Sequence, residues 1–183
     1  MARNSVGLIE LSSIAAGFEV CDAMLKTADV DLILARTICS GKYMVLVRGD
    51  VAAVRSSVEA GTRTGAFSVI DTFVIPNLDE SIFPALSGTT KIEALEALGI
   101  IESFSVASLI EGADAAVKAA HVKLIEIRLA MALGGKAFVS LTGSVADVRA
   151  AVEAGAAVIA EKGLLVNKVV IPQPRPELLN EMI

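Results

Sequence analysis

Two hydrophobic patterns alternate along the first half of the chain. Short, mostly apolar runs are typical of buried strands, while longer stretches with an apolar residue every third or fourth position are typical of amphipathic helices. The expected strands are 6–11, 30–36, 43–47 and 69–75, and the expected helices are 14–28 and 51–63, with a short helix at 79–86. Ser13 and Asp50 directly precede the two longer helices, where their side chains can cap the first turn.

The second half repeats the first. Residues 7–36 match residues 99–128 without a gap, and 14 of these 30 positions are identical. The match resumes at Gly41-Lys42 against Gly135-Lys136, after a slip of two residues in the loop 37–42. A repeat of this length is a duplicated domain and not a solenoid. The strands expected in the second copy are 98–102, 122–129, 137–141 and 164–171, and the helices are 106–120, 145–160 and 177–183.

The order strand–helix–strand–strand–helix–strand is that of a ferredoxin-like, or split β-α-β, domain. We therefore predict an α+β protein with two tandem domains, each a four-stranded antiparallel sheet with its helices on one face. Domain 1 is expected at 1–87, a linker at 88–96 and domain 2 at 97–183. Domains this small bury a limited share of their surface, so the uncovered sheet faces and edges predict assembly with other chains.

The composition bears on which partners the protein binds and where in the cell it is found. The chain of 183 residues is 54% hydrophobic, with no Trp, one Tyr and six Phe, and carries a net charge of −5. No apolar run reaches the length of about 18 residues that spans a membrane. The sequence shows no basic run typical of nucleic-acid binding and no charged-then-apolar signal segment. We expect a cytoplasmic protein, with no membrane or nucleic acid as partner, whose cysteines stay as thiols unless a metal binds them.

Catalytic patterns do not occur in the sequence. His121 is the single histidine, and there is neither a Gly-x-Ser-x-Gly string nor a phosphate-binding loop. Glu10 and Glu102 recur at equivalent positions, but they fall in or at the end of strands, where a structural hydrogen bond is the simpler interpretation. We therefore predict that the protein is not an enzyme. A ferredoxin-like sensor of small molecules, with its pocket between subunits, is an alternative of another class.

The two cysteines occupy different settings. Cys21 falls in the middle of the first helix and its counterpart is Ala113, so we interpret it as a small buried residue. Cys39 lies in the loop where the two copies differ, and the second copy has no thiol there. The cysteines are far apart in sequence and form no Cys-x-x-Cys motif. Within one chain, Cys39 is most simply a loop cysteine with no special role.

Several strings recur at matching distances in both copies. They are Val6-Gly7-Leu8-Ile9-Glu10 with Ala97-Leu98-Gly99-Ile100-Ile101-Glu102, Asp22-Ala23-Met24-Leu25-Lys26 with Asp114-Ala115-Ala116-Val117-Lys118, Val47-Arg48-Gly49-Asp50-Val51 with Leu141-Thr142-Gly143-Ser144-Val145, and Val74-Ile75-Pro76 with Val170-Ile171-Pro172. This ordered set resembles, twice over, the shell domain of bacterial microcompartments, the BMC domain. The loop 37–42 also resembles the cysteine-bearing pore loop of tandem-domain shell proteins of propanediol-using compartments, with Ser40 in place of a proline.

The resemblance implies a homotrimer shaped like a hexamer, which packs edge to edge with other shell proteins. Its central pore would be lined by Cys39 and by Thr37, Ile38, Ser40 and Gly41 of the first copy, and by Met131, Ala132, Leu133 and Gly134 of the second. The second loop could equally be simple packing. Lys26, Lys118 and Arg175 would lie on the tile edge, although both lysines could also be solvated cations near helix C-termini.

A closed trimer would bring three copies of Cys39 together on its axis. Three thiolates repel one another, and a bound cation removes that cost. Thiolate ligands suit an iron–sulfur cluster, zinc or copper(I), and residue chemistry alone leaves this choice open. The resemblance favours one [4Fe–4S] cluster per trimer, which transfers electrons across the shell to a lumenal or cytosolic redox enzyme. Zinc, and a metabolite-conducting pore without metal, are the alternatives.

Overall fold

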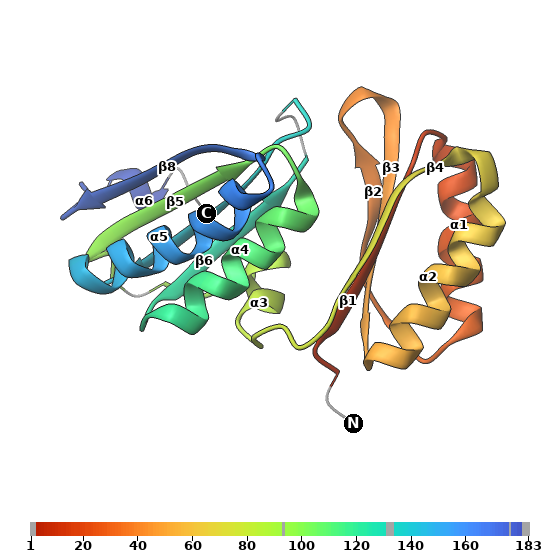
Figure 1. Ribbon diagram of the computed structural model, residues 1–183, viewed down its shortest axis with the longest axis horizontal. Helices are drawn as coiled ribbons and strands as arrows, with labels where there is room; N and C mark the ends of the chain where they lie inside the picture. The colour runs from red at the N-terminus through yellow and green to blue at the C-terminus, as the bar shows by residue number, and fades with distance from the viewer. Residues whose placement is uncertain (1–2, 93, 131–133, 176, 181–183) are drawn as a thin grey trace. The chain divides into compact units, whose positions relative to one another are not determined.

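The computed structural model describes residues 3–92, 94–130, 134–175 and 177–180 (Figure 1). The chain divides into two compact units, Met1–Leu78 and Asp79–Ile183. Each unit contains one four-stranded sheet in which all neighbouring strands run antiparallel. The predicted fold class, two tandem α+β domains, is confirmed.

The first unit follows the predicted order of elements. These are β1 (Ser5–Leu11), α1 (Ile14–Thr27), β2 (Asp31–Ile38), the 3-10 turn η1 (Cys39–Gly41), β3 (Lys42–Gly49), α2 (Val51–Gly65), the 3-10 turn η2 (Ala66–Ser68) and β4 (Val69–Ile75). The strand order is β2-β3-β1-β4. Helices α1 and α2 lie side by side on one face of this sheet (Figure 1).

The second unit repeats this arrangement and adds a short helix at its start. Its elements are α3 (Ile82–Leu86), β5 (Ala97–Ser103), α4 (Val106–Ala119), β6 (Lys123–Leu129), β7 (Ala137–Gly143), α5 (Val145–Glu161), β8 (Leu165–Pro172) and α6 (Glu177–Asn180). The strand order is β6-β7-β5-β8. The predicted short helix 79–86 forms as α3 and packs against β6 and α4. The predicted tail helix 177–183 begins as α6, and residues 181–183 lie outside the described part.

Polar side chains start the long helices as the sequence predicts. The carboxylate of Asp50 accepts hydrogen bonds from the backbone amides of Ala52 and Ala53, at 3.0 and 2.9 Å. At the equivalent place in the second copy, the hydroxyl of Ser144 accepts one from the amide of Asp147 at 3.2 Å. These caps satisfy amides that have no partner within the helix, so each helix has a defined start.

The core of the first unit lies between the sheet and its two helices. Ile9, Leu11, Met24 and Val45 are among its buried members. A Cβ atom added to Gly7 would lie 2.5 Å from the side chain of Val58, so glycine lets α2 approach β1 closely.

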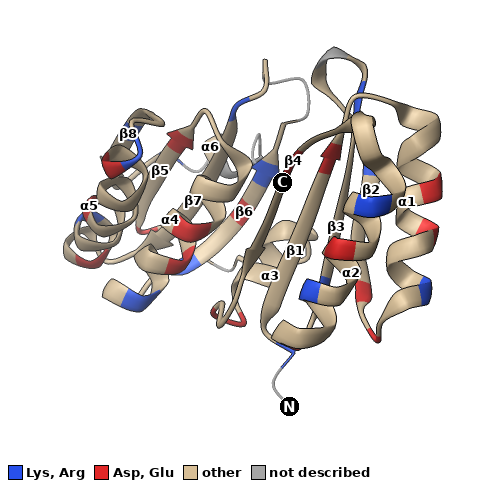
Figure 2. Ribbon diagram, turned by 45° about the vertical axis from the view of Figure 1, so that its right-hand side comes forward, with Lys and Arg blue, Asp and Glu red and all other residues tan. Residues whose placement is uncertain are grey.

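Charged side chains of both signs are interspersed over the helices and the strand ends (Figure 2). Within the part of the chain that the structure describes, no helix combines the length and the apolar character needed to cross a membrane.

Candidate functional site

Cys39 lies at the tip of the hairpin formed by β2 and β3. Ile38 pairs with Lys42 in the sheet, so only residues 39–41 form the turn. Gly41 closes it with φ +73°, and a Cβ added there would meet no atom within 4 Å. Glycine is therefore favoured at this position by the left-handed backbone and not by lack of space.

The turn is shorter than the predicted loop 37–42. Backbone pairing of Thr37 with Tyr43, and of Ile38 with Lys42, extends both strands to the turn itself. Ile38 is buried, Cys39 is partly exposed, and Thr37 and Gly41 are exposed. The buried Ile38 side chain anchors the end of β2, and the next residue carries the thiol towards the surface.

An ion pair links the base of the Cys39 turn to the centre of the sheet. The ammonium of Lys42 donates to the carboxylate of Glu10 at 2.7 Å. The second unit repeats this pair between Lys136 and Glu102 at 2.5 Å. The structural interpretation of the two glutamates is confirmed. Their lysine partners were not predicted, although the sequence carries a signal for them, because a lysine follows a glycine after each loop.

Arg36 is the one residue near the turn with a buried polar atom that lacks a hydrogen-bond partner among the described residues. Its Nε is enclosed, and burial lowers the pKa of its guanidinium. The matching Arg128 pairs with Glu126 at 2.8 Å and lies over the ring of Phe138. Leu34 stands where the second copy has Glu126, so Arg36 lacks the neighbouring carboxylate of its counterpart. Because both matching positions carry arginine, the sequence alone did not predict that their surroundings differ.

The corresponding loop of the second unit, between β6 and β7, differs in length and chemistry. Its ends are joined by a hydrogen bond from the amide of Ala130 to the carbonyl of Lys136 at 3.1 Å. Gly134 and Gly135 have φ values of +62° and +86°. Met131, Ala132 and Leu133, predicted to line the pore, lie outside the described residues, so the predicted apolar collar stays a prediction.

The two cysteines differ in exposure, because Cys39 is partly exposed and Cys21 is buried. Cys21 is buried in α1, burial raises the pKa of its thiol, and its counterpart Ala113 is fully buried. Among the described residues of one chain, no group of three or more His, Cys, Asp or Glu side chains could hold a metal ion.

The predicted edge residues each have an acidic neighbour. Lys26, in the last turn of α1, pairs with Asp22 at 2.6 Å, and Lys118, in the last turn of α4, pairs with Asp114 at 2.5 Å. Arg175 follows β8 and pairs with Glu177 at 3.1 Å. All three cationic side chains are substantially exposed, as an edge contact requires, and their place on a tile edge stays a prediction.

Comparisons with known proteins cover nearly the whole chain. A family profile described as the BMC domain matches residues 5–78 and again residues 97–174. The bacterial microcompartment shell protein PduT of Citrobacter freundii is 41% identical over 98% of this chain and 97% of its own length. EutM of Escherichia coli, also a bacterial microcompartment shell protein, is 44% identical over 46% of this chain and 84% of its own length.

A solved structure covers both units. The crystal structure of a microcompartment protein from Desulfitobacterium hafniense DCB covers 98% of this chain and 99% of its own, with a TM-score of 0.95 and 52% sequence identity. The two matches to the family profile, the two repeated sheets and these relatives agree with one another. The chain belongs to the BMC-domain family and is a structural shell protein of bacterial microcompartments, with two BMC domains in tandem.

Proposed function

We propose that three chains close into a tile with the outline of a hexamer, and that their three Cys39 turns line a central pore and hold one [4Fe–4S] cluster. The observation that carries this proposal is the single, partly exposed thiol at the tip of a tight hairpin, present in only one of the two repeats. The tile would take its place in a microcompartment shell in the cytoplasm; the relatives PduT and EutM are themselves bacterial microcompartment shell proteins.

One Cys39 thiolate per chain is enough to hold a cluster only when three chains close into a ring. Cyclic symmetry places three copies of any axial residue together, so one Cys39 per chain supplies three thiolates. Soft thiolates are the ligands that iron–sulfur clusters prefer. A [4Fe–4S] cluster usually has four cysteine ligands, so three leave one iron for a ligand that is not part of the protein. A thiol in both repeats would supply more ligands than one cluster can use.

A bound cluster would supply a one-electron carrier. The residues of the chain hold the thiol in place: Ile38 is buried behind it, and the Lys42–Glu10 pair fixes the start of β3. A cluster on the pore axis would leave little room for metabolites. We therefore propose transfer of electrons between a redox enzyme on one side of the shell and a carrier on the other.

The tile edge is proposed to carry Lys26, Lys118 and Arg175, which meet neighbouring shell proteins. Support comes from their exposure and from the relatives, several of which are themselves shell proteins. The family membership favours this assembly over the small-molecule sensor that the sequence had left as an alternative.

Two alternatives remain within the shell function. Zinc could be held by three thiolates with water as its fourth ligand. A pore without metal would conduct metabolites, and Cys39 would then have no ligand role. Both alternatives keep the trimer and differ only in what the pore contains.

Native mass spectrometry of anaerobically purified protein tests the trimer and its contents together. We expect a trimer that carries the added mass of one cluster, and a Cys39→Ser variant that forms the same trimer without it. Cys21→Ala, which introduces the residue found at the matching position of the second copy, serves as the control and should keep the cluster. A monomer or dimer contradicts the tile, and a metal-free wild-type trimer after reconstitution contradicts the cluster.

A further inference from the structure

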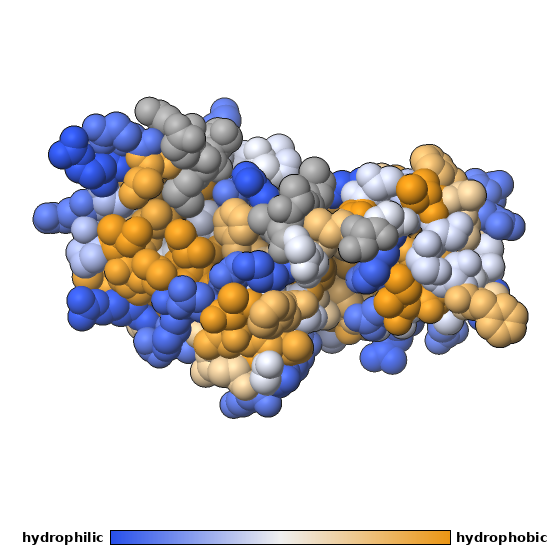
Figure 3. Space-filling model, turned by 90° about the horizontal axis from the view of Figure 1, so that it is seen from above, coloured by the Kyte–Doolittle hydropathy of each residue, from blue (hydrophilic) through white to orange (hydrophobic). Residues whose placement is uncertain are grey.

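A pocket of about 390 Å³ lies at the start of β6 in the second unit. The stretch before β5 contributes Glu96 to its lining, the start of β6 contributes His121 and Lys123, and the end of β7 contributes Thr142. Apolar side chains reach the surface of the molecule in several patches (Figure 3), whereas this pocket combines an acidic, a basic and an imidazole side chain. Its volume is in the range of pockets that bind small molecules.

The first unit has the same backbone arrangement at the start of β2. A Cβ atom added to Gly49, at the end of β3, would lie 3.3 Å from the carbonyl oxygen of Asp29. A Cβ atom added to Gly143, at the end of β7, would lie 3.0 Å from the carbonyl oxygen of His121. In both units a glycine therefore lets the end of one strand approach the chain that follows the first helix. The two places differ in their side chains.

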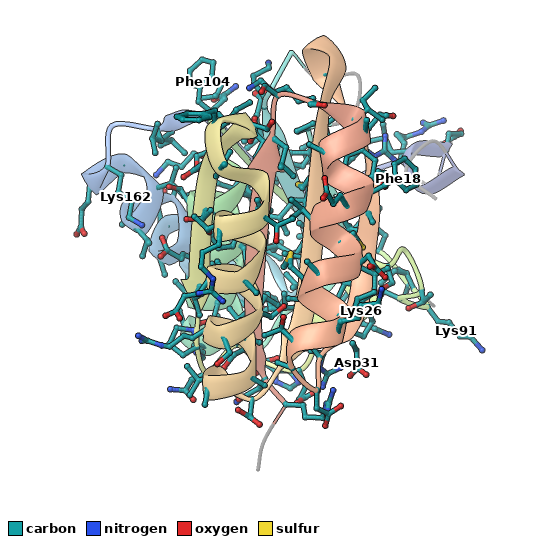
Figure 4. All side chains as sticks on the ribbon, turned by 90° about the vertical axis from the view of Figure 1, so that its right-hand side faces the viewer. Phe18, Lys26, Asp31, Lys91, Phe104 and Lys162 are labelled. Carbon is teal, nitrogen blue, oxygen red and sulfur yellow. The ribbon has the colours of Figure 1, made fainter. Side chains whose placement is uncertain are left out.

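In the first unit a cation from the same chain occupies this place. The guanidinium of Arg3 contacts the carboxylate of Asp29 at 2.8 Å and that of Asp31 at 3.1 Å. The Nε of Arg48, on β3, donates to the backbone carbonyl of Arg3 at 2.5 Å and so holds the segment before β1. Figure 4 shows Asp31 near the C-terminal end of α1. The two carboxylates thus have a cationic partner within their own unit.

The second unit replaces each charged group of this arrangement. His121 and Lys123 stand at the positions of the two aspartates, and Leu95 stands at the position of Arg3. Thr142 takes the place of the arginine on β3. The site has therefore exchanged two carboxylates for two basic side chains, and it has lost the guanidinium that filled it.

The pocket of the second unit holds opposite charges that do not neutralise each other. Glu96 and Lys123 both line it, yet in the described part of the chain they form no ion pair with each other. The ammonium of Lys123 donates instead to the backbone carbonyl of Lys91. An ammonium has three donors, so this bond leaves two for a ligand. His121, two residues before Lys123, adds an imidazole to the same lining.

We propose that this pocket binds a small zwitterion of the amino-acid class. The carboxylate of the ligand would lie against Lys123 and His121, and its ammonium against Glu96. Such a ligand would make a charge-assisted hydrogen bond at each end and neutralise both charges of the pocket. The pocket lies at the end of β6 and β7 opposite to the loop that corresponds to the Cys39 turn, so the proposal does not depend on what the pore holds.

The single histidine of the chain gives a direct test. Glycine or β-alanine, two zwitterions of different length, should shift the one imidazole NMR signal of the full-length, ¹³C-histidine-labelled protein in a saturable way. Acetate and methylammonium each carry only one of the two charges and should bind about tenfold more weakly or worse. The proposal is overturned if neither zwitterion gives a saturable shift, or if acetate or methylammonium binds as tightly as the better zwitterion.

Two variants assign the contacts by the same titration. Lys123→Met should weaken zwitterion binding by about tenfold or more, because it removes the ammonium that faces the carboxylate. Glu96→Gln should also weaken zwitterion binding but should not weaken that of acetate, which has no cationic group. Lys162→Met, which removes a partly exposed lysine of the same unit outside the pocket, is the control and should bind like the wild type. Unchanged zwitterion affinity in both pocket variants would place the ligand elsewhere and overturn the proposal.

Discussion

At the scale of single residues, the tip of the β2–β3 hairpin depends on Gly41. Its left-handed φ of +73° costs an L-residue with a side chain about 1–2 kcal/mol, although space for the side chain is present. Gly41→Ala should therefore lower the free energy of unfolding in urea by about that amount. Gly41→Asn should lower it less, because asparagine tolerates this conformation better. Equal losses in both variants would show that the backbone angle is not the cause.

The Lys42–Glu10 pair makes a second prediction at this scale. Lys42→Met leaves the carboxylate of Glu10, only 17% exposed, without its cationic partner. We expect a loss of about 1 kcal/mol in the free energy of unfolding, since a partly buried charge loses its hydrogen bond. Lys136→Met, which breaks the repeated pair in the second unit, is the matched control and should cost a similar amount. Unchanged stability in both variants would contradict a structural role for the pairs.

At the scale of elements, two glycines let the backbones of α4 and α5 come close together. A Cβ atom added to Gly155 would lie 2.5 Å from the carbonyl oxygen of Gly112. Backbone cannot move aside cheaply, so Gly155→Ala should destabilise the protein by about 1–3 kcal/mol. The matching Gly61→Ala would instead meet side-chain atoms of Ile9 and Met24, which can move by rotation, and should cost less. Chemical denaturation of both variants measures the difference, and a larger loss for Gly61→Ala would show that the backbone contact is not the cause.

The start of α3 predicts a dependence on pH. Hydrogen bonds from Ser81 hold the pKa of the Asp79 carboxyl below its ordinary value of 3.8. A lowered pKa stabilises the fold above the unfolded value, and this stabilisation is lost as pH falls through the folded value. Asp79→Ala should therefore cost about 1 kcal/mol at neutral pH and less at about pH 3. Urea unfolding at the two pH values measures the cost, and the same cost at both would contradict a role for the ionised carboxylate.

The sequence predicted the elements better than their ends and partners. Periodicity located every long strand and helix, but the pairing of Ile38 with Lys42 that shortens the Cys39 turn depends on cross-strand hydrogen bonds. The helix at 79–86 was expected from its apolar residues, yet its contact with Asp114 joins residues far apart in sequence. Arg36 and Arg128 are identical in sequence and differ in their surroundings, which only the folded chain defines.

At the scale of the whole molecule, duplication changes what symmetry permits. A tile built from single-domain chains repeats every loop six times, whereas a closed trimer of tandem chains lets a loop change at three positions. The two units differ in the loop that is predicted to line the pore. The β2–β3 hairpin carries Cys39, whereas the corresponding loop between β6 and β7 is longer and has no thiol. Matching side chains also differ in exposure between the units, because Phe18 and Leu32 are exposed whereas Ile110 and Leu124 are buried.

The low-temperature EPR spectrum of the anaerobically purified and reduced protein tests the central claim most directly. We predict the signal of a reduced [4Fe–4S] cluster, with about four irons per three chains, in the wild type and in Cys21→Ala. Cys39→Ser should form the same trimer and give no signal. An iron-free, EPR-silent wild-type trimer after reconstitution, or an unchanged signal in Cys39→Ser, would contradict a cluster held by the Cys39 turn.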